Sequence, residues 1–171
     1  VVRLKGGDPS IFARSAEELA ACAAHGVAVR ICPGITAASA AAASSLVSLT
    51  LRGAARHLTF LTAHVREGEA WPHDWQRLAD DGGTLAIYMG RAAAPAIARG
   101  LIAAGRDPAT PVMVAVNVSL PNERCLRGRL DALAFLVRTV GNDDPTLLLI
   151  GEAVAQSTGA HMAARTLQHH D

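Results

Sequence analysis

The chain has few aromatic residues, few cysteines and no excess of charge of either sign. Phe, Trp and Tyr make up 4% of its 171 residues, so aliphatic side chains and alanine must build most of the core. The formal net charge is +1, and the Arg and Lys residues are scattered without interleaved aromatic residues. This pattern argues against a nucleic-acid-binding surface, and we expect no nucleic-acid partner.

The three cysteines, Cys22, Cys32 and Cys125, are odd in number and lie far apart. They show no C-x-x-C spacing, which disfavours a disulfide framework or a zinc site. His57 and His64 bracket one expected strand and cannot share a metal without other ligands, so we predict no metal site. Unpaired cysteines are typical of a reducing compartment, so we expect a cytoplasmic location.

Residues 31–51 carry no charge, which raises the question of a membrane span. The stretch contains Pro33, Gly34 and many Ser, Thr and Ala residues, whereas a spanning helix is richer in Leu, Ile, Val and Phe. We interpret it as a turn followed by a buried helix, and we expect no membrane association.

Apolar runs alternate with helical patterns along the chain, half of which is hydrophobic. The patterns predict strands at 1–4, 27–32, 57–63, 84–89, 111–118 and 146–150, and helices at 13–25, 36–46, 74–81, 92–104 and 130–140, with a loop between 118 and 130. Strands that alternate with helices indicate an α/β fold with parallel βαβ units. The fully apolar run TLLLI at 146–150 predicts a strand in a sheet that is covered on both faces.

The Leu51-Arg52-Gly53 stretch is the best candidate for a boundary. It divides the chain into the C-terminal part of a first α/β lobe at 1–52, a second α/β lobe at 53–155 and a polar tail at 156–171. Two strands are too few for a stable sheet. We therefore expect the first lobe to be incomplete, with its missing part preceding Val1.

The first candidate site is the glycine pair that follows the expected strand at 1–4. Gly6 and Gly7 let backbone N–H and C=O groups approach a ligand closely, and Asp8 adds an acceptor for an ammonium group or sugar hydroxyls. In parallel α/β sheets, ligands bind beyond the carboxyl ends of the strands. The alternative is an ordinary tight turn, because Gly-Gly-Asp-Pro is also rich in turn-forming residues.

The second candidate site is the segment CPGITAASAAAA, which follows the next expected strand and so falls on the same edge of the sheet. Pro33-Gly34 turns the chain and Thr36 begins a helix, whose first N–H groups favour a carboxylate or another anion. Ala37 and Ala38 leave room for a flat group. Alternatively, Thr36 is a simple helix cap. Two glycine-containing loops on adjacent strand ends favour one shared ligand crevice.

Two later strands end in AIYMG and VAVNVS. By itself Met89 is most simply a core residue, and residues 117–119 most simply form a turn. The sequence supports no Ser-His-Asp or Cys-His arrangement, and no GxGxxG segment opens a helix as in dinucleotide-binding oxidoreductases.

Taken together, the segments of this chain resemble the tetrapyrrole methylase family in content and order. They are VVRLKGGDPSIF, CPGITAASAAA, LTFLTAH, TLAIYMG, TPVMVAVNVS and PTLLLIGEAV, and they extend from Val1 to about Val154. Each segment alone is weakly specific, whereas the full set in this order is strongly specific. The resemblance implies a two-lobed α/β fold whose first lobe is incomplete here.

The resemblance also implies a cofactor, a substrate and an assembly. The family uses S-adenosylmethionine, which lies in the cleft between the lobes of each subunit of a homodimer. The branch that this chain resembles most methylates two pyrrole carbons of uroporphyrinogen III to give precorrin-2, in sirohaem and cobalamin biosynthesis. By resemblance, the cofactor contacts are Gly6, Gly7, Asp8, Ile11, Thr36, Ala37, Met89 and Val118, with backbone contacts from Thr146 and Leu147.

The chain departs from the family pattern at several positions. The glycines that usually follow GGDPxxF are Ala13 and Ser15 here, the histidine of the usual PLTHRG is Leu51, and an acid of the VAVNVS segment is Val116. The usual GxGPGDxxLLT loop and the acid/base residues are expected upstream of Val1, so no catalytic residue is assigned. Two alternatives stay open: a methylase acting later on the corrin ring, and a non-catalytic dimerisation or binding module.

Overall fold

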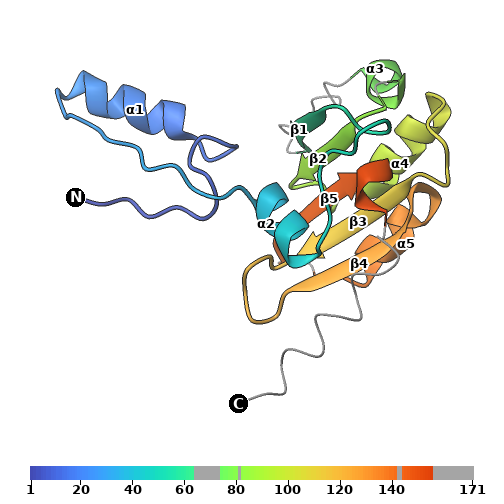
Figure 1. Cartoon of the computed structure of the whole chain (residues 1–171). Helices are drawn as coiled ribbons and strands as arrows, with labels where there is room; N and C mark the ends of the chain where they lie inside the picture. Colours follow the sequence, from blue (N-terminus) through green and yellow to red (C-terminus); the bar gives the residue numbers. More distant parts are fainter. Residues whose placement is uncertain (64–73, 81, 142–143, 156–171) are drawn as a thin grey trace, which may run out of the picture.

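The computed structural model describes residues 1–63, 74–80, 82–141 and 144–155. A five-stranded sheet with the order β1-β2-β5-β3-β4 forms the centre of the fold (Figure 1). Its strands are β1 (Leu58–Thr62), β2 (Thr84–Tyr88), β3 (Pro111–Val116), β4 (Arg124–Arg129) and β5 (Thr146–Ile150).

The sheet is mixed. β1 and β2 are parallel, whereas β5 runs antiparallel to both of its neighbours, β2 and β3, and β4 runs antiparallel to β3. The prediction of parallel units therefore holds only for the β1–β2 pair among the described strands. Because β5 is antiparallel, its first residues lie at the sheet edge where β2 and β3 end.

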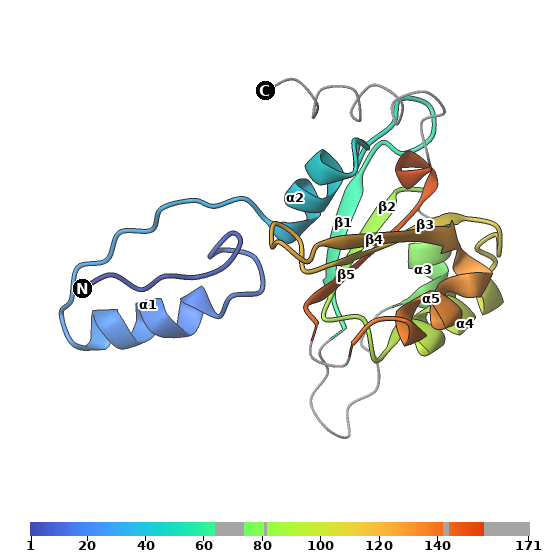
Figure 2. The ribbon, with the colours of Figure 1, turned by 90° about the horizontal axis from the view of Figure 1, so that it is seen from below.

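Successive residues of the central strands face opposite sides of the sheet, as the pleat requires. On β5, Leu148 and Ile150 join one apolar cluster, whereas Leu147 and Leu149 join the other. One face is covered by α3 (Trp75–Asp80), α4 (Ala94–Ala103), the 3-10 helix η1 (Leu130–Ala132) and α5 (Leu133–Arg138), and the other by α2 (Ala37–Ser44) with the 3-10 helix η2 (Glu152–Val154) (Figure 2). Burial on both faces confirms the interpretation of TLLLI and explains its uninterrupted apolar character.

Residues 1–35 form an arm that carries α1 (Ser15–Ala24) and projects beside the sheet (Figure 1). None of the ten residues of α1, all of them described, is buried. Lys5 holds the arm together internally, since its Nζ pairs with Glu18 at 2.8 Å and donates to the Ala13 carbonyl at 2.6 Å.

The predicted strands at 1–4 and 27–32 are wrong. Both segments run as irregular chain, and Val27, Val29 and Ile31 are exposed. A β-branched run favours an extended backbone, but a strand also needs a hydrogen-bonded neighbour. Within the described residues, neither segment has one.

β4 replaces part of the expected loop between 118 and 130. Its sequence, RCLRGR, has three arginines and a glycine, a composition that does not indicate a strand. It forms because β3 offers a complete ladder from Val116↔Arg124 to Pro111↔Arg129. As an edge strand it is charged, which disfavours pairing with another chain.

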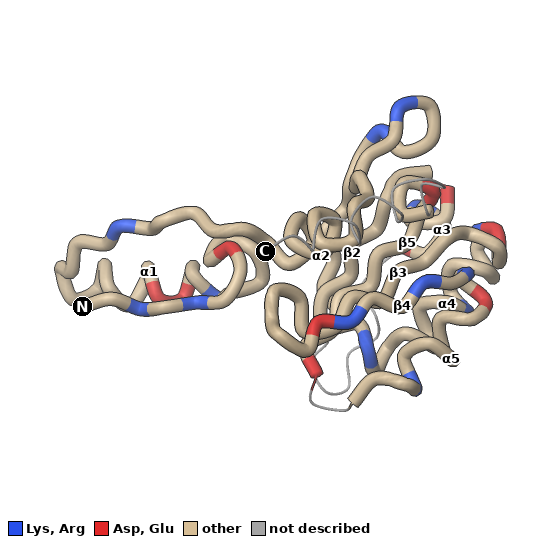
Figure 3. Tube along the Cα trace, turned by 60° about the horizontal axis from the view of Figure 1, so that its bottom comes forward, with Lys and Arg blue, Asp and Glu red and all other residues tan. Residues whose placement is uncertain are grey.

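The remaining predicted elements are confirmed, with helices one to three residues shorter at their ends. α2, from the predicted first lobe, packs on the sheet of the predicted second lobe, and the boundary at 52/53 stays a prediction. The predicted tail at 156–171 and His64 lie outside the described residues. No helix in the described part of the chain has the length and apolar character needed to cross a bilayer. Basic and acidic residues are interspersed along the chain trace (Figure 3).

Candidate functional site

A cavity of about 540 Å³ lies where the arm and α2 meet the edge of the sheet formed by the ends of β2 and β3 and the start of β5. This volume is within the range of small-molecule sites. All eight predicted contact residues line it: Gly6, Gly7, Asp8, Ile11, Thr36, Ala37, Met89 and Val118. The remaining lining residues are Phe12, Tyr88, Arg91, Ala92, Ala115, Asp144, Pro145, Thr146 and Leu147. The structure therefore brings together segments that are up to 141 positions apart in sequence, from Gly6 to Leu147.

The Gly-Gly-Asp-Pro segment forms a turn that is organised by the Asp8 carboxylate. Its Oδ1 accepts a hydrogen bond from the Ser10 backbone N–H at 2.7 Å, and its Oδ2 accepts one from the Gly34 N–H at 3.3 Å. The pKa of Asp8 lies below its ordinary value, chiefly because of the Ser10 N–H bond. The segment is thus both a turn and part of a cavity wall, and Asp8 presents a negative charge there.

The two glycine-containing loops touch through their backbones. A Cβ atom on Gly34 would lie 2.2 Å from the Gly7 carbonyl oxygen, and Gly7 itself has a φ of +75°. Side chains cannot be accommodated at such a distance, so glycine at position 34 permits the contact. The shared crevice predicted from the two motifs is therefore formed by direct loop-to-loop packing.

Thr36 occupies the N-cap position of α2, as predicted, but its side chain makes no capping hydrogen bond to the helix. Instead, Thr36 Oγ1 shares a short hydrogen bond with the Tyr88 hydroxyl. The same hydroxyl accepts a hydrogen bond from the Ala38 N–H at 3.3 Å. The first turn of α2 is thus capped by a side chain from the end of β2.

Sequence reasoning missed Tyr88, which lies beside the selected Met89. Its ring contacts Phe12 of the arm, with centroids 5.0 Å apart, and Phe60 of β1, with centroids 5.8 Å apart. Two signals could have indicated it: Tyr88 is the single tyrosine of the chain, and it ends an expected strand directly before Met89 and Gly90.

Met89 is 51% exposed and has a φ of +54°, so its interpretation as a core residue is wrong. A left-handed conformation is uncommon for such a side chain, and strained backbone positions are frequent at functional sites. Asn117, just before Val118, shares this conformation with a φ of +52°. Both strand ends therefore turn sharply at the cavity.

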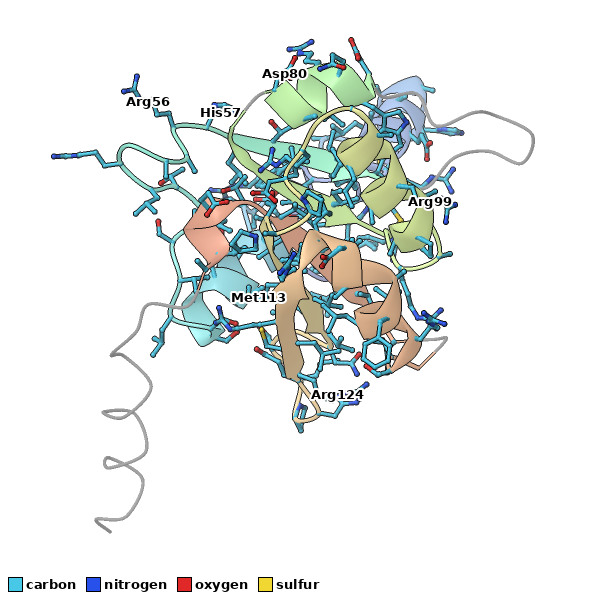
Figure 4. All side chains as sticks on the ribbon, turned by 90° about the vertical axis from the view of Figure 1, so that its right-hand side faces the viewer. Arg56, His57, Asp80, Arg99, Met113 and Arg124 are labelled. Carbon is cyan, nitrogen blue, oxygen red and sulfur yellow. The ribbon has the colours of Figure 1, made fainter. Side chains whose placement is uncertain are left out.

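Asp144 is a second carboxylate in the cavity wall that the sequence did not reveal. Its Oδ1 accepts a hydrogen bond from Asn117 Nδ2 at 3.0 Å, and its Oδ2 pairs with Arg124 at 3.1 Å. The pKa of Asp144 lies below its ordinary value, first because of the Asn117 amide and then because of the positive charge of Arg124. Figure 4 shows Arg124 at the rim of the fold, in contrast to the enclosed Met113.

The lining combines aliphatic and aromatic walls with the ionised carboxylates of Asp8 and Asp144, the Arg91 guanidinium and exposed backbone groups of the glycine loops. Such a lining suits an organic ligand that has a flat apolar part and charged parts. Within the described ranges, no three His, Cys, Asp or Glu side chains come together as potential metal ligands.

The fold and the cavity define an α/β ligand-binding protein, and comparison with known proteins establishes its family. The family model described as tetrapyrrole (corrin/porphyrin) methylases matches residues 1–134. The chain belongs to the tetrapyrrole methylase family, and the predicted fold class is confirmed. Members of this family use S-adenosylmethionine, as the motifs implied.

Among curated relatives, the siroheme synthase of Tolumonas auensis is 44% identical over 155 residues, which cover 91% of this chain and 32% of that protein. Siroheme synthase 1 of Cronobacter sakazakii is 46% identical over 154 residues, covering 90% of this chain and 32% of the relative. The chain thus spans about a third of the length of these relatives.

Two solved structures share the fold. A cobalt precorrin-4 methyltransferase of cobalamin biosynthesis superimposes with a TM-score of 0.80 at 26% identity, covering 88% of this chain and 63% of that one. The uroporphyrin-III C-methyltransferase of Thermus thermophilus, in complex with S-adenosyl homocysteine, superimposes with a TM-score of 0.73 at 38% identity, covering 90% and 66%. Tetrapyrrole C-methylation is therefore the chemistry of the proteins that this chain resembles.

Proposed function

We propose that this chain is the cofactor-binding part of a methyltransferase that uses S-adenosylmethionine to methylate uroporphyrinogen III to precorrin-2. The observation that carries the proposal is the convergence of all eight expected contact residues on one cavity of about 540 Å³. The higher identity to the uroporphyrin-III enzyme than to the precorrin-4 enzyme, 38% against 26%, supports this substrate.

The residues of the cavity fit the cofactor. Ile11, Ala37, Val118 and Leu147 provide apolar walls for a flat base. The ionised Asp8 and the backbone groups of the glycine loops suit an ammonium group and hydroxyls. Gly34 keeps the two loops in contact, so that both walls face the same space.

When bound, S-adenosylmethionine supplies a methyl group that its sulfonium already activates for attack by an electron-rich carbon. The task of the protein is then mainly to align the two reactants and to exclude water. Ile11, Met89 and Val118 lie where they can exclude water from the cavity, and the ionised Asp8 favours a cationic ligand over a neutral one. None of the described residues is proposed as the catalytic acid or base. We also propose a homodimer and a cytoplasmic location, by analogy with the family and from the free cysteines.

Calorimetric titration with S-adenosylhomocysteine tests the cofactor assignment. Ala37→Leu fills the cavity and should weaken binding by more than about tenfold, because a bulkier side chain then occupies ligand space. Ala96→Leu, on the exposed side of α4, makes the same change outside the cavity and should leave the affinity unchanged. If the unaltered chain does not bind S-adenosylhomocysteine, the cofactor assignment is wrong.

Incubation of the complete enzyme that contains this chain with S-adenosylmethionine and separate tetrapyrroles tests the substrate. Uroporphyrinogen III should gain the mass of two methyl groups. A gain only on cobalt-precorrin-4 would assign the chain to the later corrin methylases, the alternative that the TM-score of 0.80 favours. Cofactor binding without methylation of either substrate would support a non-catalytic binding module, as the departures at Ala13, Ser15 and Leu51 suggest.

A further inference from the structure

The Tyr88 hydroxyl lies at the beginning of a helix to which it is not adjacent in sequence. It accepts the Ala38 N–H at 3.3 Å, and it shares a hydrogen bond with Thr36 Oγ1. The phenol oxygen accepts from Ala38, and either hydroxyl can be the donor in its hydrogen bond with Thr36. A single O–H group thus makes both hydrogen bonds that join the first turn of α2 to the end of β2.

The first turn of α2 depends on this cap because the helix packs on the sheet through small side chains, and its far end is held separately by Arg127, which donates to the Ser45 carbonyl at 2.9 Å. Its sequence, AASAAAAS, contributes only Ala38, Ala41 and Ala42 to the buried interior. An alanine buries little apolar area, so packing alone holds the helix weakly. Thr36 makes no capping hydrogen bond within the helix, and removing a helix cap typically destabilises the first turn.

The ring of Tyr88 also contacts the wall of the cavity that the arm forms. It packs at 5.0 Å, tilted by 56°, against Phe12, which ends the GGDPSIF segment. On its other side it meets Phe60 of β1 at 5.8 Å, edge to face. Aromatic pairs with these geometries are favourable. Tyr88 is therefore in contact with the arm, α2 and the sheet at once, and it lines the cavity itself.

We propose that Tyr88 is a positioning residue that holds the two cofactor loops against the sheet, its ring ordering the GGDPSIF loop and its hydroxyl ordering the first turn of α2. This inference rests on the proposed function, because the ordered walls are those of the cofactor cavity. Tyr88 takes no part in bond making or breaking. Its contribution to affinity arises because the loops are ordered before the ligand arrives.

Tyr88→Phe removes the hydroxyl and keeps the ring. At a temperature where both proteins are fully folded by circular dichroism, the variant should bind S-adenosylhomocysteine about tenfold more weakly, because the two partly buried hydrogen bonds of the hydroxyl are lost. Thr139→Val also removes a hydroxyl with a hydrogen bond, to Leu136 O, but outside the cavity, and should bind as the unaltered chain does.

The double variant Tyr88→Phe with Thr36→Val separates positioning from direct contact. If the two hydroxyls act through their shared hydrogen bond, removing both should cost no more affinity for S-adenosylhomocysteine than the more damaging of the two single substitutions. If the fold-losses of affinity in the two single variants multiply in the double variant, the proposal is overturned, because each hydroxyl then contributes independently of the other.

Direct observation is possible because the chain contains one tyrosine. Labelling Tyr88 at Cζ gives a single carbon-13 resonance that reports on its hydroxyl. Thr36→Val should shift this resonance in the ligand-free chain, and an unchanged resonance would show that the bond is absent. If the unaltered chain fails to bind S-adenosylhomocysteine, the proposed function falls. If it binds and Tyr88→Phe binds equally well, the proposed function stands and the role of Tyr88 is refuted.

Discussion

The Gly34 N–H donates to Oδ2 of Asp8 at 3.3 Å, across a contact in which position 34 has no room for a side chain. This relationship joins two motifs that lie 26 residues apart in sequence. It joins two glycine-containing loops into one wall of the cavity.

Gly34→Ala should open the crevice. The added methyl would lie 2.2 Å from the Gly7 carbonyl oxygen, so the two loops must separate and affinity for S-adenosylhomocysteine should fall by more than about tenfold. Gly26→Ala adds a methyl in open space at a φ of +65°, outside the cavity. Gly26→Ala therefore controls for backbone strain in the arm. If it lowers the affinity as much as Gly34→Ala does, the contact at Gly34 does not shape the crevice.

Asp8→Asn should weaken binding of S-adenosylmethionine about tenfold by removing the negative charge. The folded-state pKa of Asp8 is depressed, so its charge is present above the ordinary value of about 3.8 and is lost as the pH falls through the lower folded-state pKa. Affinity of the unaltered chain should therefore be constant between about pH 5 and pH 8 with respect to this group. Asp131→Asn, at an exposed ion pair with Arg129, should bind normally. If Asp8→Asn binds S-adenosylmethionine as tightly as the unaltered chain, the Asp8 charge does not contribute to binding.

Asn117 should stabilise the fold through both its side chain and its backbone. It is 4% exposed, has a φ of +52° and donates to Asp144. Asn117→Ala loses the hydrogen bond and places alanine in the left-handed region, so the free energy of unfolding should fall by about 2 kcal/mol. Asn117→Gly loses only the hydrogen bond, so its free energy of unfolding should fall by about half as much as that of Asn117→Ala. Urea denaturation measures both, and equal stability of the two variants would show that the backbone conformation is not strained.

Arg106 should be irreplaceable by lysine. It is 7% exposed, and its two terminal nitrogens donate to different carbonyls, Leu78 O at 3.3 Å and Gly83 O at 3.1 Å. A single ammonium group cannot reproduce this fork, so Arg106→Lys should lower the free energy of unfolding by about 2 kcal/mol. Arg99→Lys, on a side chain that projects outward from α4 (Figure 4), should change it by less than about 0.5 kcal/mol. Similar melting temperatures for the two variants would refute the assigned role of Arg106.

Several features were predictable because they depend on local sequence. The run TLLLI forms β5 with the predicted bounds, since a fully apolar run of that length suits a strand buried on both faces. The eight expected contact residues lie around one cavity, although the strands at 1–4 and 27–32 that were expected to place the two glycine loops there do not form. Their role in cofactor binding stays a prediction.

Other features were not predictable because they depend on a partner elsewhere in the chain. The arginine-rich β4 is a strand only because β3 completes its ladder. Residues 27–32, with a stronger β pattern, are not a strand, because in the described chain no neighbour pairs with them. β propensity reports how well a side chain fits a pleated sheet, but a strand forms only where a neighbouring strand is present to pair with it.

By itself the sequence determined the family, the glycine loops and the positions of most helices and strands, because residue order and local conformational preference are enough for these. Only the tertiary structure decided that the Tyr88 hydroxyl caps α2 and that Asn117 and Arg124 surround Asp144. These relationships join residues up to 52 positions apart, as Thr36 and Tyr88 are. Their geometry depends on strand order and direction in the folded sheet, which no local pattern encodes.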